Sequence, residues 1–213
     1  MFTQSRSLQY LPFRIRPSPP EFFRLCGEHE ESVVHLLAAC PSLAATAYLY
    51  RHNLVAGVVH WHLMRLHGFL PGSSCWFTHR PPAVVESSAV KILWDFSLQS
   101  ASHHLSNHPD IVLFDYDLKK IYFIEISCPA DVNVPSKEQE KLQKYQSLAH
   151  DYHLMYRMPV IIIPVVVGCT GVVSSNCITH LRRIPDFSNN LFCTIQKAAI
   201  IGTVHVLRCT NVI

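Results

Sequence analysis

The chain has 213 residues, a formal net charge of +3 at neutral pH, 49% hydrophobic residues and 15% charged residues. This length and composition exclude an intrinsically disordered chain and predict one sizeable hydrophobic core, with or without a small appended module. The weak positive charge allows contact with nucleic acid through a local patch, but many ordinary proteins carry as much.

No segment of the sequence predicts export or membrane insertion. Residues 1–21 contain scattered arginines and prolines in place of the continuous apolar core of a secretory signal. The longest apolar run, Val160–Gly168, is about half as long as a bilayer-spanning helix and contains Pro164. Most of the cysteines stand singly among apolar or hydroxyl-bearing neighbours, which favours reduced thiols in a nuclear or cytoplasmic protein that is not secreted.

The first part of the chain divides into three predicted segments. Residues 1–22 are rich in proline and lack periodicity, which predicts an irregular lead-in. Apolar residues at helical spacing between Val33 and Leu66 predict helices in an N-terminal module of residues 23–70. Glycines and prolines then predict a linker over residues 71–89.

The remaining residues, 90–213, are expected to form the main domain, in which strand and helix signals alternate. A helix or strand is expected at Val90–Asp95. The predicted strands are Pro109–Phe114, Ile121–Ser127 and Val160–Gly168. The predicted helices are Lys137–Ala149, capped by Ser136, then Ile178–Ile184 and Leu191–Ile201. This order predicts an α/β or α+β fold with a mixed sheet flanked by helices.

Two acidic residues, Asp110 and Glu125, are the most informative feature of the main domain. A symmetric hairpin that pairs Phe114 with Ile121 also places Asp110 opposite Glu125, with their side chains on one face and roughly 5 Å apart at Cβ. Like charges at this separation repel each other unless a positive group lies between them, and hard divalent cations prefer carboxylate oxygen. We therefore expect a metal site here, although a lone glutamate in a strand is more often a solvated residue.

Three lysines follow at helical spacing. Lys137, Lys141 and Lys144 occupy one face of the predicted helix. If that face packs over the hairpin, an ammonium group reaches the acids, and a metal ion with a lysine beside it is the minimum apparatus for hydrolysing a phosphodiester. The alternative is a solvated stripe on a helix rich in glutamate.

Three segments of the main domain together form a specific motif: Pro109–Asp110, Glu125–Pro129 and Lys141–Tyr145. They resemble the restriction-like endonuclease at the C-terminal end of site-specific non-LTR (LINE-type) retrotransposon polyproteins, which belongs to the PD-(D/E)xK nuclease class. The resemblance implies a restriction-endonuclease-like core in which Asp110 and Glu125 bind Mg²⁺ or Mn²⁺. Ser127 occupies the position of the lysine in the wider class, so the resemblance implies that Lys141, our first choice, or Lys144 takes its role.

The resemblance extends to the N-terminal module. Cys26, His35 and Cys40 match the last three ligands of the family's C-x2-C-x8-H-x4-C zinc knuckle. Phe23 stands where the first cysteine is expected, and a closed structural zinc site needs four ligands. Replacement by His29 or His52 and a metal-free helical remnant are the alternatives.

The resemblance also implies partners and a role. Double-stranded DNA is the expected partner and element RNA a further one, with no membrane contact, and Arg51, His108 and Lys137 are expected to bind nucleic acid. In the family this region nicks chromosomal DNA so that the exposed 3′ end primes reverse transcription. No reverse transcriptase motif is present, so we expect the tail of such a polyprotein. The rival hypotheses are a catalytically decayed nucleic-acid-binding remnant and a structural protein. The sequence predicts no oligomeric state.

Overall fold

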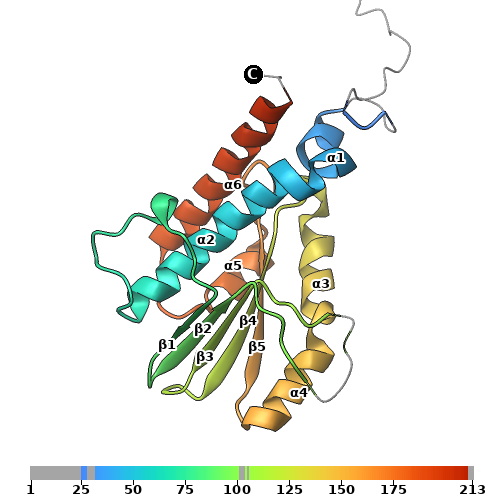
Figure 1. Ribbon diagram of the computed structural model, residues 1–213. Helices are drawn as coiled ribbons and strands as arrows, with labels where there is room; N and C mark the ends of the chain where they lie inside the picture. The colour runs from blue at the N-terminus through green and yellow to red at the C-terminus, as the bar shows by residue number, and fades with distance from the viewer. Residues whose placement is uncertain (1–24, 28–31, 101–103, 105, 211–213) are drawn as a thin grey trace, which may run out of the picture.

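The computed structural model describes residues 25–27, 32–100, 104 and 106–210. The predicted lead-in, Phe23 and His29 lie outside the described residues. Helices pack against both faces of one sheet (Figure 1), which confirms the predicted mixed α and β architecture.

The sheet has five strands in the order β1-β2-β3-β4-β5. The pairs β1–β2, β2–β3 and β3–β4 are antiparallel, whereas β4–β5 is parallel, so the sheet is mixed as predicted. The strands are β1 (Val84–Glu86), β2 (Val90–Trp94), β3 (Ile111–Asp115), β4 (Lys120–Ser127) and β5 (Val160–Val166). A parallel neighbour needs a crossover connection, which the helices between β4 and β5 provide.

Helices form where the sequence shows helical periodicity. The α-helices are α1 (Pro41–Leu43), α2 (Leu49–Leu66), α3 (Val134–Lys144), α4 (Gln146–Tyr156), α5 (Ser175–Leu181) and α6 (Asn189–Cys209). Short π-helical turns at His35–Ala39 and Ala44–Tyr48 complete the helical N-terminal module, and 3₁₀ turns lie at Trp76–Thr78 and Asp131–Asn133. Among the described helices, α6 is the one long and apolar enough to span a membrane, a property that core helices share.

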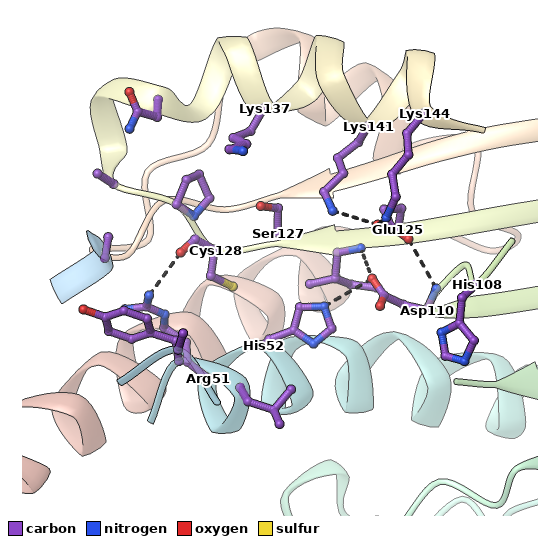
Figure 2. Close-up of a pocket in the computed structure, with 18 residues that line it drawn as sticks. Arg51, His52, His108, Asp110, Glu125, Ser127, Cys128, Lys137, Lys141 and Lys144 are labelled. Carbon is purple, nitrogen blue, oxygen red and sulfur yellow. Dashed lines mark hydrogen bonds and ion pairs between the residues drawn. The ribbon is translucent and has the colours of Figure 1, made fainter. Parts of the chain in front are cut away.

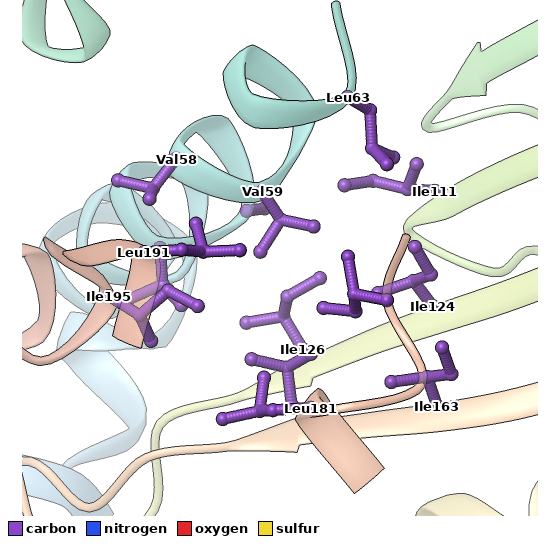
Figure 3. Packing of buried hydrophobic residues seen from close by; sticks show 14 of the residues in the cluster. Val58, Val59, Leu63, Ile111, Ile124, Ile126, Ile163, Leu181, Leu191 and Ile195 are labelled. Atoms are coloured by element: carbon purple, nitrogen blue, oxygen red, sulfur yellow. The ribbon is translucent and has the colours of Figure 1, made fainter. Parts of the chain in front are cut away.

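Both faces of the sheet are buried, which explains why the strands read as nearly continuous apolar runs. Alternate residues of β3 and β4, such as Ile111 and Ile124, pack against α2, α5 and α6 (Figure 3). The intervening residues, such as Val112 and Phe123, pack against α4 on the opposite face. The alternation means that even-numbered residues of β3 and odd-numbered residues of β4 point toward the α4 side.

The N-terminal module shares the core of the main domain. Val55, Val59 and Leu63 of α2 lie in the same hydrophobic cluster as the sheet residues. α2 and α6 lie side by side (Figure 1). At their crossing a Cβ atom added to Gly202 would lie 2.7 Å from the Cα of Arg51, so only glycine permits this approach. The position of α2 relative to the sheet is therefore closely defined.

The structure corrects three local predictions. The predicted linker contains β1. Of the two alternatives at Val90–Asp95, the strand is the one that forms, as β2. Ser136 is not a helix cap: α3 begins at Val134, and the Ser136 hydroxyl donates to the Asn133 carbonyl. The predicted helix over Lys137–Ala149 is interrupted at Tyr145, which is fully buried and donates a hydrogen bond to the carbonyl of His108. Burying this side chain separates α3 from α4.

Candidate active site

Asp110 and Glu125 meet at one end of the hairpin, as predicted. Phe114 pairs with Ile121 and Ile111 pairs with Ile124, which places the next residue of each strand side by side. The backbone N–H of Asp110 donates to Oε2 of Glu125 at 3.4 Å. By the alternation of β4, the Glu125 side chain points to the α4 side of the sheet, toward α3, whereas the Asp110 carboxylate lies at the end of the sheet between Glu125 and His52 of α2 (Figure 2).

Glu125 is buried and receives two lysines. Its exposed fraction is 2%, and Oε1 lies 2.7 Å from Nζ of Lys141 and 2.8 Å from Nζ of Lys144. The two lysines are three residues apart on α3 and therefore lie on one face of that helix. A buried carboxylate without a cation beside it would be strongly destabilising, so α3 supplies the charge that permits a glutamate in this strand.

Asp110 is held through one of its oxygens. Oδ2 accepts a hydrogen bond from the backbone N–H of Ile126 at 2.6 Å and lies 3.2 Å from Nε2 of His52 in α2. Burial raises the pKa of Asp110, but the hydrogen bond and charge of His52, the Ile126 amide and Lys141 outweigh burial and lower it overall. The carboxylate is therefore ionised at neutral pH.

Whereas the pKa of Asp110 is shifted downward, that of His52 is shifted upward. Burial lowers its pKa, whereas the hydrogen bond and charge of Asp110 raise it, and the net pKa lies above the usual value for histidine. The imidazole thus carries positive charge more readily than a solvated histidine at the same pH. His52 lies 58 positions from Asp110 in the sequence, and no local pattern indicates this contact.

The acids and lysines line an open cleft of about 510 Å³ between α3 and the start of α2. Lys137 and His108, two of the residues expected to bind nucleic acid, also line it. Nζ of Lys137 lies 2.6 Å from the exposed Glu140, and Nδ1 of His108 lies 3.3 Å from Asp95. Exposed ion pairs contribute little to stability, so both side chains can exchange these partners for a ligand.

Arg51 does not meet the expectation of a nucleic-acid-binding residue. Its exposed fraction is 1%, and its guanidinium donates to the carbonyls of Leu37 and Cys128 and to the Thr203 hydroxyl. The three acceptors lie in the π-helical turn before α1, directly after β4, and in α6. Because buried carbonyls need donors, Arg51 fastens these segments together and is not available to a phosphate group.

The acidic pair fits a hard divalent cation. Both hydrogen bonds that Asp110 accepts from described residues end on Oδ2, so Oδ1 keeps its lone pairs. Glu125 adds a second carboxylate beside it. Mg²⁺ is usually bound through one or two carboxylates and completes its octahedron with water or substrate phosphate, which the open cleft admits.

A second group of metal-binding side chains lies in the N-terminal module. The ligand atoms of Cys26, His35 and Cys40 lie within 4.8 Å of one another, and no other trio of such residues is found in the described part of the chain. This trio could hold a metal ion. His52 does not complete it, because its ring is directed to Asp110.

Comparison of the chain with protein-family models finds no match, and no curated protein is similar to it in sequence.

Proposed function

We propose that the chain contains a divalent-metal-dependent DNA endonuclease of the restriction-like type. The observation that carries the proposal is the buried Glu125, which lies beside Asp110 and receives both Lys141 and Lys144 at the floor of an open cleft. Apolar residues would stabilise this part of the core at least as well, because buried charges add little net stability. Two acids and two lysines at one point therefore favour a functional role.

The arrangement of elements supports a restriction-like core. Asp110 immediately precedes β3, Glu125 lies in the antiparallel neighbour β4, and the crossover to the parallel strand β5 carries the lysines on α3. This arrangement agrees with the resemblance of the sequence to the PD-(D/E)xK class. Ser127 stands where the wider class has its lysine, and Lys141 and Lys144 reach Glu125 from α3 instead (Figure 2).

The proposed chemistry is hydrolysis of a phosphodiester. A bound Mg²⁺ or Mn²⁺ would lower the pKa of a water molecule and polarise the phosphate. Asp110 and Glu125 would hold the ion, while Lys141 or Lys144 would neutralise charge that develops on the phosphate oxygens. Lys137 and His108, at the wall of the cleft, would bind the neighbouring backbone of double-stranded DNA.

The resemblance adds a biological role to this proposal. The cut would be a nick in chromosomal DNA whose 3′ end primes reverse transcription in a non-LTR retrotransposon, with element RNA as a further partner and the nucleus as the site of action. Arg51 is not part of this proposal, because its guanidinium is buried.

The test is a plasmid-nicking assay with purified full chain. We expect Mg²⁺-dependent nicking that EDTA abolishes and that Asp110→Ala reduces by at least about 100-fold. Asp117→Ala, an exposed aspartate in the β3–β4 turn, is the matched control and should nick like the parent. Equal nicking by the parent protein and Asp110→Ala would rule out the assignment.

The rival hypothesis is a nucleic-acid-binding remnant without catalysis, and Phe23 in the knuckle pattern favours it. It predicts DNA retention that weakens as salt increases, with no metal-dependent cleavage. The nicking assay with a parallel filter-binding experiment separates the two hypotheses.

For the trio of Cys26, His35 and Cys40 we propose zinc as the ion, bound with one ligand position left to water or to a residue outside the described chain. Co²⁺ titration followed by absorbance should give thiolate-to-metal bands that Cys40→Ser removes. Absence of these bands in the parent protein would show that the module is metal-free.

A further inference from the structure

We propose that His52 is a positioning residue of the endonuclease centre, which holds the carboxylate of Asp110 in the orientation that binds the metal ion. The inference rests on the proposed function. It is carried by the contact of Nε2 of His52 with Oδ2 of Asp110 at 3.2 Å, shown as a dashed line in Figure 2.

Asp110 needs such a partner because of its place in the chain. It lies one residue before β3 begins, so the ladder between β3 and β4 does not include it. The Ile126 amide fixes one side of Oδ2 at 2.6 Å, and His52 approaches the same oxygen from α2. With Oδ2 held by two donors, the carboxylate cannot rotate freely, and Oδ1 is the oxygen left for a metal ion.

The hydrogen bonds of His52 argue against a role as metal ligand or general base. Nε2 faces Asp110 Oδ2, and Nδ1 lies 3.0 Å from Oδ1 of Asn53. Both ring nitrogens thus face oxygen atoms of neighbouring side chains, and an Nε2 that donates to Asp110 has no lone pair for a metal ion. His52 therefore acts through Asp110, as residues behind metal ligands generally do.

α2 is fixed firmly enough to make this contact precise. Arg51, the neighbour of His52, binds the carbonyl of Cys128, which lies three residues after Glu125. Thr203 of α6 accepts from the same guanidinium, and Gly202 allows the two helices to touch. Two consecutive residues of α2 thus contact the segments that carry both acids. The N-terminal module is, by this inference, part of the endonuclease centre and not a separate DNA-binding unit.

The test compares His52→Leu with His52→Gln in the full chain. The glutamine amide nitrogen is separated from Cα by as many bonds as Nε2 of histidine, so it can donate to Asp110, whereas leucine cannot. We expect His52→Leu to weaken Mn²⁺ binding, measured by calorimetry without DNA, by about 10-fold or more, and His52→Gln to restore most of the affinity. The Mg²⁺ concentration for half-maximal nicking should accordingly be highest for His52→Leu and close to the parent value for His52→Gln.

Two controls make the result specific. His62→Leu removes a hydrogen bond from the same helix, to the carbonyl of Pro185, and should leave Mn²⁺ affinity unchanged. If His52→Leu does not fold, His52→Asn replaces it, because its amide is one bond shorter and should not reach Asp110.

The outcomes separate this inference from the proposed function. The positioning role would be overturned if His52→Leu (or His52→Asn) bound Mn²⁺ as tightly as His52→Gln. It would also be overturned if His62→Leu lost as much Mn²⁺ affinity as His52→Leu. If Asp110→Asn abolishes metal binding and nicking while the His52 variants match the parent, only the inference fails. If Asp110→Asn itself binds Mn²⁺ and nicks like the parent, the proposed function fails.

Discussion

The ammonium group of Lys141 lies 2.7 Å from Oε1 of Glu125, a carboxylate with an exposed fraction of only 2%. Lys144 shares the same oxygen at 2.8 Å. Both cations that contact Glu125 thus come from α3, and in the proposed function a metal ion and a phosphate would take over part of this charge balance.

Removing both lysines should destabilise the fold. In Lys141→Met/Lys144→Met, Glu125 keeps its burial and loses its cations, so we expect the free energy of unfolding to fall by about 3 kcal/mol in urea titrations. Adding Glu125→Gln to this variant should recover part of the loss. Lys137→Met, which breaks only a pair with the exposed Glu140, should cost less than about 0.5 kcal/mol. An equal cost for the double variant and Lys137→Met would contradict the account.

The two lysines should differ in their effect on cleavage. The Lys141 side chain is 16% exposed and that of Lys144 is 32% exposed, and Nζ of Lys144 also lies 4.7 Å from the centre of the Tyr145 ring. Lys141 is therefore the more deeply placed cation. We expect Lys141→Met to lower the single-turnover nicking rate by about 100-fold and Lys144→Met by less. A larger loss for Lys144→Met would assign the role to that residue.

Arg51 should contribute to stability and not to DNA affinity. Arg51→Met leaves the buried carbonyls of Leu37 and Cys128 without their donor, so we expect a loss of about 3 kcal/mol in the free energy of unfolding. Arg65→Met, on the exposed side of the same helix, should change stability by less than about 1 kcal/mol. At a temperature where Arg51→Met is folded, its DNA affinity should equal that of the parent, and a selective loss of binding would restore the original expectation.

Several features of the fold and site could be predicted because they depend on local rules. The hairpin register follows from the symmetric closure of β3 and β4, and it brings Asp110 next to Glu125 at the end of the hairpin. The shared helix face of Lys141 and Lys144 follows from their spacing of three residues. These contacts join residues that are close in the sequence.

The features that escaped prediction depend on contacts between distant segments. The sequence gives no sign that Arg51 is buried, because its acceptors lie near positions 37, 128 and 203. The contact of His52 with Asp110 is equally remote. β1 has only three residues, too few for a periodic pattern, and the break at Tyr145 arises because its side chain is buried, which overrides good helix propensity.

The buried His60 should make stability depend on pH. Its side chain is fully buried, Nδ1 pairs with His79, and burial lowers its pKa to about 3. In the unfolded chain the pKa returns to about 6.5, so below this pH the unfolded state binds a proton that the native state excludes. Stability is fully present above pH 6.5 and falls toward pH 3, by up to about 1.4 kcal/mol per pH unit.

His60→Gln is the matched variant for this prediction. Glutamine does not titrate, so the free energy of unfolding, measured in urea at pH 7, 6 and 5, should decline less steeply than in the parent protein. Parallel pH profiles for the two proteins would show that His60 is not the group responsible.

Anomalous scattering from crystals soaked in Mn²⁺ is the sharpest test of metal binding by Asp110 and Glu125, because it locates the ion without any assay of cleavage. We expect a peak within about 2.5 Å of a carboxylate oxygen of both Asp110 and Glu125, and its loss in Asp110→Asn. A protein that gives no peak there, or gives one only at Cys26, His35 and Cys40, would contradict the proposed endonuclease centre.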